Sequence, residues 1–243
     1  MGLGTLINVA CIVAGGLVGM LGGSLITKQL QNALMRACGV CVMFVGIAGT
    51  LEKMLVANVA TDGTVAFASA GTLTMVASMA LGTVAGEVAD LDGRFENLGV
   101  WLRDRVGAGS DTRFVDGFVT ASLTVCIGAM AIVGSIQDGL AGDWSTLALK
   151  GSLDAIIVCA MTASMGKGCI FSALPVGVLQ GCITAFAHLL QPVMTAGALA
   201  NLSLVGSMLI FCVGMNLIWP RTFKPANMLP AVVVAAAMAF LPL

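Results

Sequence analysis

Charged residues are scarce in this chain of 243 residues: 9% are charged, whereas 58% are hydrophobic. Soluble domains carry about 25% charged residues, so this chain has too few to cover a globular surface in water. Its formal net charge of −1, with only eleven Lys and Arg residues, also excludes the basic surface that nucleic acid requires. The composition therefore excludes soluble enzymes and nucleic-acid-binding proteins. It indicates an integral membrane protein whose main partner is the lipid bilayer.

Tyrosine is absent, aromatic residues make up 5% of the chain, and there is a single histidine. Transmembrane β-barrels need alternating strands and aromatic girdles, and neither pattern is present. Motifs of metalloproteases, serine hydrolases and P-loop enzymes are also missing. We therefore expect no enzyme, no cofactor and no metal site. The 31 glycines are typical of helices that pack closely in lipid, and such small-residue faces also predict a homo-oligomer.

Long apolar runs predict an all-α, polytopic transmembrane helix bundle of about eight spans, forming a single integral-membrane domain over residues 1–243. The expected spans are residues 3–24, 34–56, 66–86, 115–136, 146–166, 171–190, 198–219 and 226–242. The fifth span contains Lys150 and Asp154, so it is either complete or re-entrant. Gly166-Lys167-Gly168 predicts a break between the fifth and sixth spans.

The placement of basic residues predicts the orientation of the bundle. Nine of the eleven lie in the first, third, fifth and seventh loops, and the even loops hold only Lys53 and, at the mouth of the fifth span, Lys150. Because cytoplasmic loops are enriched in Lys and Arg, the odd loops are expected in the cytoplasm and both termini outside.

The third loop, about residues 87–116, is the longest polar segment. Apolar residues recur in it at helical spacing: Leu91, Phe95, Leu98, Leu102 and Val106. This pattern predicts a cytoplasmic amphipathic connector at the membrane interface. The connector is either a gate or partner surface, or a segment that rests on lipid headgroups.

A faint internal similarity predicts an inverted repeat. Residues 8–12 (Asn-Val-Ala-Cys-Ile) resemble residues 180–183 (Gln-Gly-Cys-Ile), and a Val-Gly step follows at 45–46 and 213–214. Spans one to three and six to eight are offset by five, which would give them opposite orientations, a plan common in transporters. Chance similarity among helices rich in Gly, Ala and Val is the alternative.

Ionisable groups inside a membrane are costly, so their positions are the best indicator of function. Asp154 lies about two turns into the fifth span. It is either neutralised by Lys150 four residues earlier or faces a hydrated cavity as an ion or proton site. Gln137 and Asp138 end the fourth span, and we expect Asp138 and Asp154 near the same outer end, framing an entrance for a cation.

Uncharged polar residues also occur within the spans, among them Asn8, Gln180 and Asn216. They either form hydrogen bonds between helices or converge on a neutral polar path at the repeat interface.

Several motifs together resemble one known family. The most specific block runs from Gly128-Ala-Met130 through Gly134-Ser135-Ile-Gln137-Asp138-Gly139 to Gly142-Asp143, and it is accompanied by Gly4-Thr5-Leu-Ile-Asn8, Gly82-Thr-Val-Ala-Gly86-Glu87, Lys150-Gly-Ser-Leu-Asp154 and Phe171-Ser172-Ala-Leu-Pro175. In these segments the chain resembles the YqgA family of bacterial inner-membrane proteins (domain of unknown function 554). The resemblance implies a multi-pass protein of the bacterial inner membrane and supplies no substrate or catalytic residue.

The polar residues within the spans favour a transporter or channel for an ion or small polar solute. Asp154 and Asp138 are then the charged groups of the site, and Gln137, Asn8, Gln180 and Asn216 line the path. A non-transporting membrane scaffold or assembly partner, which binds through the amphipathic connector and the glycine faces, is the alternative.

Overall fold

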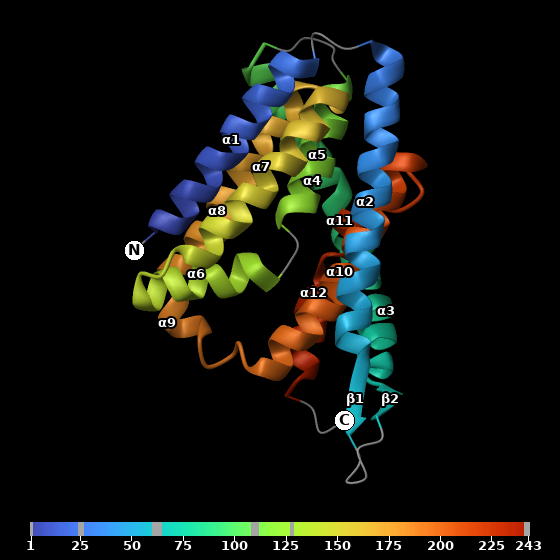
Figure 1. The fold of residues 1–243 in the computed structure, drawn as a ribbon, viewed down its shortest axis with the longest axis vertical. Helices are drawn as coiled ribbons and strands as arrows, with labels where there is room; N and C mark the ends of the chain where they lie inside the picture. Colours follow the sequence, from blue (N-terminus) through green and yellow to red (C-terminus); the bar gives the residue numbers. More distant parts are fainter. Residues whose placement is uncertain (1, 24–26, 60–64, 108–111, 127–128, 241–243) are drawn as a thin grey trace.

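Helices form nearly all of the computed structural model, which describes residues 2–23, 27–59, 65–107, 112–126 and 129–240. The elements are α1 (Leu3–Gly23), α2 (Lys28–Met54), β1 (Leu55–Val59), β2 (Val65–Ser69), α3 (Thr72–Ala89), α4 (Leu91–Arg105), α5 (Thr112–Cys126), α6 (Ala129–Ala141), α7 (Ser145–Met165), the 3₁₀ helix η1 (Lys167–Ser172), α8 (Ala173–Ala185), α9 (Ala187–Leu190), α10 (Ala196–Ile218), α11 (Pro225–Met228) and α12 (Pro230–Met238). The two strands pair antiparallel as a hairpin between α2 and α3 (Figure 1).

The helices confirm a polytopic membrane protein, and the predicted count of about eight spans is roughly consistent with them. Among the described residues, six helices are long and apolar enough to cross a membrane, and the bent pair α5–α6 would make a seventh. Pro225–Met238 is a shorter apolar segment at the place of the predicted eighth span.

The predicted break between the fifth and sixth spans is present, since α7 ends at Met165, and a further break falls in the fourth span. Helices α5 and α6 meet at 62°, whereas α7 is one continuous helix of 21 residues. The third span also begins later than predicted, because β2 occupies Val65–Ser69 and the helix starts only after Gly71, which is left-handed at φ 73°.

Glycines set the contact between α1 and α7, which run parallel side by side (Figure 1). A Cβ atom added at Gly15 or Gly19 would lie 2.2 Å from the carbonyl oxygen of Ala155 or Cys159, respectively. Only a residue without a side chain permits this backbone approach, which is the usual basis of close helix packing in lipid.

Three further helix pairs pack antiparallel. In α1 and the η1–α8 segment, Gly16 lies opposite Ile170 and Val9 opposite Gly177. In α2 and α10, Gly39 lies against Leu217 and Gly46 against Phe211; in α3 and the α11–α12 segment, Gly82 lies against Ala231 and Gly86 against Asn227. Each pair therefore joins one of the first three predicted spans to one of the last three.

The basic loops gather at one end of the molecule. The end of α1 and the start of α2 lie at the top of Figure 1, far from the two strands. Gly23 packs on Ala163 near the end of α7, and Gly168 packs on Phe114 near the start of α5, so these connections lie at the same end. This arrangement is consistent with the orientation predicted from the Lys and Arg residues.

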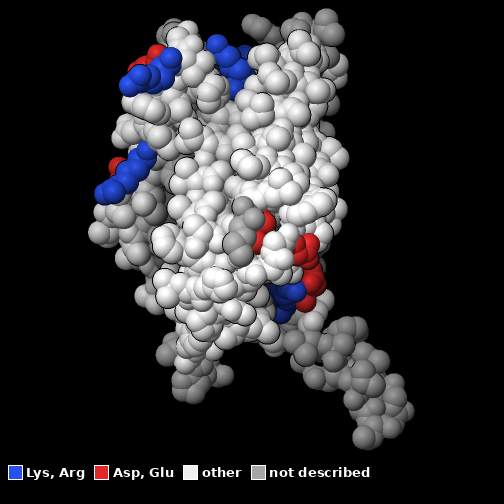
Figure 2. All heavy atoms as spheres, turned by 90° about the vertical axis from the view of Figure 1, so that its left-hand side faces the viewer, with Lys and Arg blue, Asp and Glu red and all other residues white. Residues whose placement is uncertain are grey.

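The outer surface is apolar, as contact with lipid requires. Val88, Ile156, Leu189 and Val233 are more than two-thirds exposed, and most of the face in Figure 2 is free of charged side chains. The predicted connector is present as α4, whose Leu102 packs in a cluster with Phe114 and Phe118 of α5.

Candidate functional site

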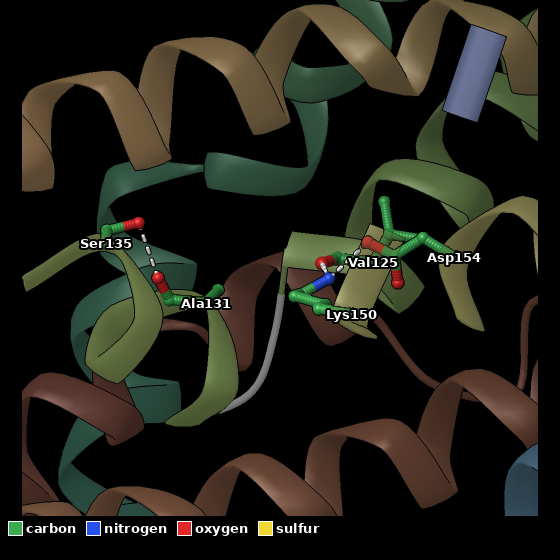
Figure 3. Close-up of polar contacts among 5 residues, drawn as sticks. All are labelled: Val125, Ala131, Ser135, Lys150 and Asp154. Atoms are coloured by element: carbon green, nitrogen blue, oxygen red, sulfur yellow. Dashed lines mark hydrogen bonds and ion pairs between the residues drawn. The ribbon is translucent and has the colours of Figure 1, made fainter. Parts of the chain in front are cut away.

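Lys150 and Asp154 form a buried ion pair on α7, with the spacing that the sequence predicts. Lys150 Nζ also donates a hydrogen bond to the carbonyl oxygen of Val125 at 2.8 Å (Figure 3). Val125 lies in the last turn of α5, where carbonyl groups lack helical partners and the helix dipole is negative. The Lys150 ammonium group therefore binds both the Asp154 carboxylate and a free carbonyl oxygen at the C-terminus of α5, beside the break in the fourth span.

Asp138 on α6 is fully buried and binds the first turn of α1. Its Oδ2 accepts a hydrogen bond from the backbone N–H of Gly4 at 2.9 Å. Its Oδ1 has no hydrogen-bond partner among the described residues, and no ion pair of Asp138 is found there. The structure thus places Asp138 inside the bundle, at a helix N-terminus, rather than at an open entrance.

Three more side chains with unsatisfied polar atoms are buried close to Asp138. Thr5 and Asn8 on α1 are 7% and 0% exposed, and Gln180 on α8 is 1% exposed. The Thr5 hydroxyl and both polar atoms of each amide lack hydrogen-bond partners in the part of the chain that is described. We call Thr5, Asn8, Asp138 and Gln180 the embedded cluster.

The packing of three helices brings the embedded cluster together. Thr5 follows the glycine that binds Asp138, and Asn8 lies one turn further along α1. Because α8 runs antiparallel to α1 with Gly177 opposite Val9, Gln180 lies about 4.5 Å nearer the start of α1, level with the end of its first turn. Helix α6 closes the group, since Gly139, next to Asp138, packs on the backbone of Thr184 in α8.

Asn8 links the embedded cluster to the ion pair on α7. Its Cα faces Gly151, and its side chain lies beside the Asp154 carboxylate. The amide makes no hydrogen bond of regular geometry with Asp154 or with any other described residue. Asp154, Asp138, Asn8 and Gln180, which the sequence singles out separately, are therefore neighbours in one region.

Gln137 and Asn216 have structural partners instead. Gln137 Oε1 accepts a hydrogen bond from Thr146 Oγ1 at 2.7 Å, which ties α6 to α7. Asn216 on α10 donates from Nδ2 to the carbonyl oxygen of Phe223 and accepts at Oδ1 from its N–H, both at 2.9 Å. The structure therefore does not bring Asn216 to the embedded cluster.

Asn216 contributes instead to a cavity of about 510 Å³ at the basic-loop end, which we call the end cavity. Its charged lining comprises Asp92 and Glu96 of α4, Arg113 and Asp116 of α5, and Arg221 and Lys224 of the loop after α10. Partial burial and, next, the nearby Glu96 carboxylate raise the pKa of Asp92.

Sequence reasoning missed two parts of this arrangement. Thr5 has a signal, because it is a polar residue three positions before Asn8 and so shares its helical face. The sequence signal for the end cavity is weaker. Asp92 and Glu96 are like charges at an i, i+4 spacing, which destabilises a helix unless another element brings positive charges close to them. Among the described residues, no group of three or more His, Cys, Asp and Glu side chains has the geometry to hold a metal ion.

Comparisons with known proteins extend over nearly the whole chain. The chain is 27% identical over 237 residues to the uncharacterized membrane protein YdfK of Bacillus subtilis, covering 98% of this chain and 95% of that protein. It is 24% identical over 242 residues to the uncharacterized protein YqgA of Escherichia coli, covering 97% and 95%, respectively. No solved structure matches. The profile of the family described as "Protein of unknown function (DUF554)" matches residues 3–240, and the chain belongs to this family of proteins.

Proposed function

We propose that the protein is a transporter or channel for an ion or small polar solute in the bacterial inner membrane. The observation that carries the proposal is the embedded cluster, where a carboxylate and three polar side chains are buried with unsatisfied atoms. Burying such groups without partners costs free energy, and polar or ionisable groups inside a membrane usually mark a substrate or ion pathway.

Helix ends at the site support the proposal. Asp138 binds the N-terminal turn of α1, and Lys150 binds the C-terminal turn of α5 beside the 62° bend. Transporters often bind their substrates where discontinuous helices present such ends near the middle of the membrane. A backbone broken inside a bilayer is tolerated where it lines a cavity or is buried in protein.

The antiparallel helix pairs support the predicted inverted repeat. A two-fold axis in the membrane plane would relate α1 to α8, α2 to α10 and α3 to α12, and each of these pairs is in antiparallel contact. The same relation pairs Asn8 with Gln180, the two amides with unsatisfied buried atoms. A site at the interface of inverted repeats is suited to alternating access, because each half can rock against the other.

The end cavity provides an approach from the basic-loop side. It is lined by Leu123 of α5, two residues before the carbonyl group that binds Lys150. A solute that enters this cavity from the cytoplasm would therefore come within one helical turn of the α5–α6 break.

The experiment is a current measurement on proteoliposomes adsorbed to a solid-supported membrane. Jumps of Na⁺, K⁺, H⁺ and mixed small metabolites are applied to wild type, Asp138→Asn and Asp143→Asn. Asp143 is an exposed acid in the α6–α7 loop, so its variant removes the same charge outside the cluster. We expect a current with at least one solute in wild type and Asp143→Asn, and its loss in Asp138→Asn. Absence of current with every solute would contradict transport.

A further inference from the structure

The buried charges of the described residues do not balance. They are two carboxylates, Asp138 and Asp154, and one ammonium group, Lys150. Lys150 binds Asp154 and the carbonyl group of Val125, so no opposite charge among the described residues is paired with the Asp138 carboxylate. An uncompensated charge in a low-dielectric interior is strongly unfavourable, so an ionised Asp138 needs one positive charge beside it.

The N-terminus of α1 supplies only part of this compensation. A helix N-terminus is equivalent to roughly half a positive charge, and Asp138 receives it through one hydrogen bond to Gly4. This bond uses Oδ2 alone. The second oxygen, Oδ1, remains buried and without a partner among the residues that the structure describes.

Besides the two amide nitrogens, which are hydrogen-bond donors, the unsatisfied atoms of the embedded cluster are oxygens of the kind that a small, hard cation prefers. They include the carboxylate oxygen of Asp138, the amide oxygens of Asn8 and Gln180, and the hydroxyl oxygen of Thr5. Carboxylate, carbonyl and hydroxyl oxygens suit hard cations, whereas softer transition metals prefer His and Cys. The four side chains come from α1, α6 and α8.

We propose that the embedded cluster binds one monovalent metal cation, which is the transported or coupling ion of this protein. The proposal rests on the proposed transport function and names its substrate class. A divalent ion would replace one uncompensated negative charge by an uncompensated positive charge, and an anion would increase the imbalance. Close packing at Gly4, where a Cβ would lie 2.8 Å from Leu147 and 3.1 Å from Asp138 Oδ2, favours an ion over an organic solute.

The test measures cation binding separately from transport. Purified protein in detergent is unfolded thermally in choline chloride, and LiCl, NaCl or KCl then replaces the choline salt at constant ionic strength. A ligand that binds only the folded state raises Tm as its concentration exceeds Kd. MgCl₂ at matched ionic strength serves as the divalent control.

Three variants define the site. Asp138→Asn keeps an oxygen that accepts from Gly4 N–H, so it removes the charge with little change in shape. We expect the apparent affinity for the cation to fall at least about tenfold, because the charged partner of a buried ion is lost. Gln180→Met should weaken binding less, and Asp143→Asn should bind as wild type does. The Tm of each variant in choline chloride shows whether it is folded.

The outcomes separate this proposal from the proposed function. Stabilisation by an alkali cation in wild type, lost in Asp138→Asn, would support the site, even if no solute evoked a current and the transport function were contradicted. No stabilisation by any alkali cation would overturn it, and so would equal stabilisation in Asp138→Asn. A current carried only by protons or by an organic solute would leave transport standing and overturn the metal cation.

Discussion

The embedded cluster and the end cavity contain similar residues in different physical settings. In the cavity of about 510 Å³, Asp92 is partly exposed and Glu96 is exposed, and Arg221 and Lys224 line the same space, so water and opposite charges weaken the field of each carboxylate. In the cluster, Asp138 is fully buried and forms no ion pair with any described residue. An aspartate is therefore a partly exposed group in one region, and in the other it is a buried carboxylate for which we propose a bound cation.

The two regions also differ in how one asparagine in each is hydrogen-bonded. Asn216 at the end cavity satisfies its amide with two hydrogen bonds to Phe223. Asn8 in the cluster is completely buried and satisfies neither polar atom with a described residue. The amide of Asn216 holds the loop after α10, whereas we propose that the amide of Asn8 contributes to a cation site.

The largest expected effect comes from breaking the helix contact that holds the cluster in place. Gly19→Ala places a Cβ 2.2 Å from the carbonyl oxygen of Cys159, whereas Gly22, on the same helix, has open space around it. We expect Gly19→Ala to abolish or severely reduce the monodisperse folded protein in size-exclusion chromatography, and Gly22→Ala to behave as wild type. Equal behaviour of the two variants would contradict the α1–α7 contact.

The next largest effect is the loss of stability when a buried ion pair is broken, compared with the loss when an exposed pair is broken. Lys150→Met leaves Asp154 buried without its partner, which should lower the free energy of unfolding by about 3–5 kcal/mol. Lys224→Met removes an exposed pair with Glu87 at 3.8 Å, which should cost less than about 1 kcal/mol. Denaturant titration in detergent measures both.

The double variant Lys150→Met with Asp154→Asn serves as the control for this prediction. It removes both charges, so it should recover part of the stability lost in Lys150→Met alone. If the double variant were as unstable as the sum of the two single variants, the two residues would not act as a pair.

A smaller effect separates Asn8 from Asn216. Asn216→Ala removes two hydrogen bonds to the backbone of Phe223, at a cost of about 1–2 kcal/mol. Asn8→Ala removes an unsatisfied buried amide, so thermal unfolding in choline chloride should show little loss of stability while cation binding weakens. A larger loss of Tm in Asn8→Ala than in Asn216→Ala would contradict this difference between the two asparagines.

The smallest expected effect is at the end cavity. Burial and Glu96 raise the pKa of Asp92 above its usual value, so ionisation of this carboxyl opposes folding. This contribution is absent below the pKa of the unfolded chain, about 3.9, and grows as pH rises through the higher folded pKa. Asp92→Asn should therefore be slightly more stable than wild type at pH 7, by less than about 1 kcal/mol, and equal to it near pH 3. Thermal unfolding at both pH values tests this.

Local patterns in the sequence predicted the membrane class, most of the spans, α4 and the Lys150–Asp154 pair. These features depend on residues within a few helical turns of one another. The contact between Asp138 and Gly4 joins residues 134 positions apart, so it follows from tertiary packing that no local pattern encodes. For the same reason, the sequence could not distinguish Asn8 from Asn216, or show that the bend falls between α5 and α6.

The parallel contact of α1 with α7 also has a consequence for biogenesis. Asn8 and Gly151 face each other, but 143 residues separate them in the chain. At about 5–20 residues per second of synthesis, α1 must wait roughly 7–30 s before its partner is made. During this interval Gly15, Gly19 and the amide of Asn8 lie in lipid or against the insertion machinery. Helix α1 can tolerate that delay, because it carries no charge and its polar residues are limited to Thr5 and Asn8. Helix α7 carries two charges, and it is made only after its partner α1 is already in the membrane.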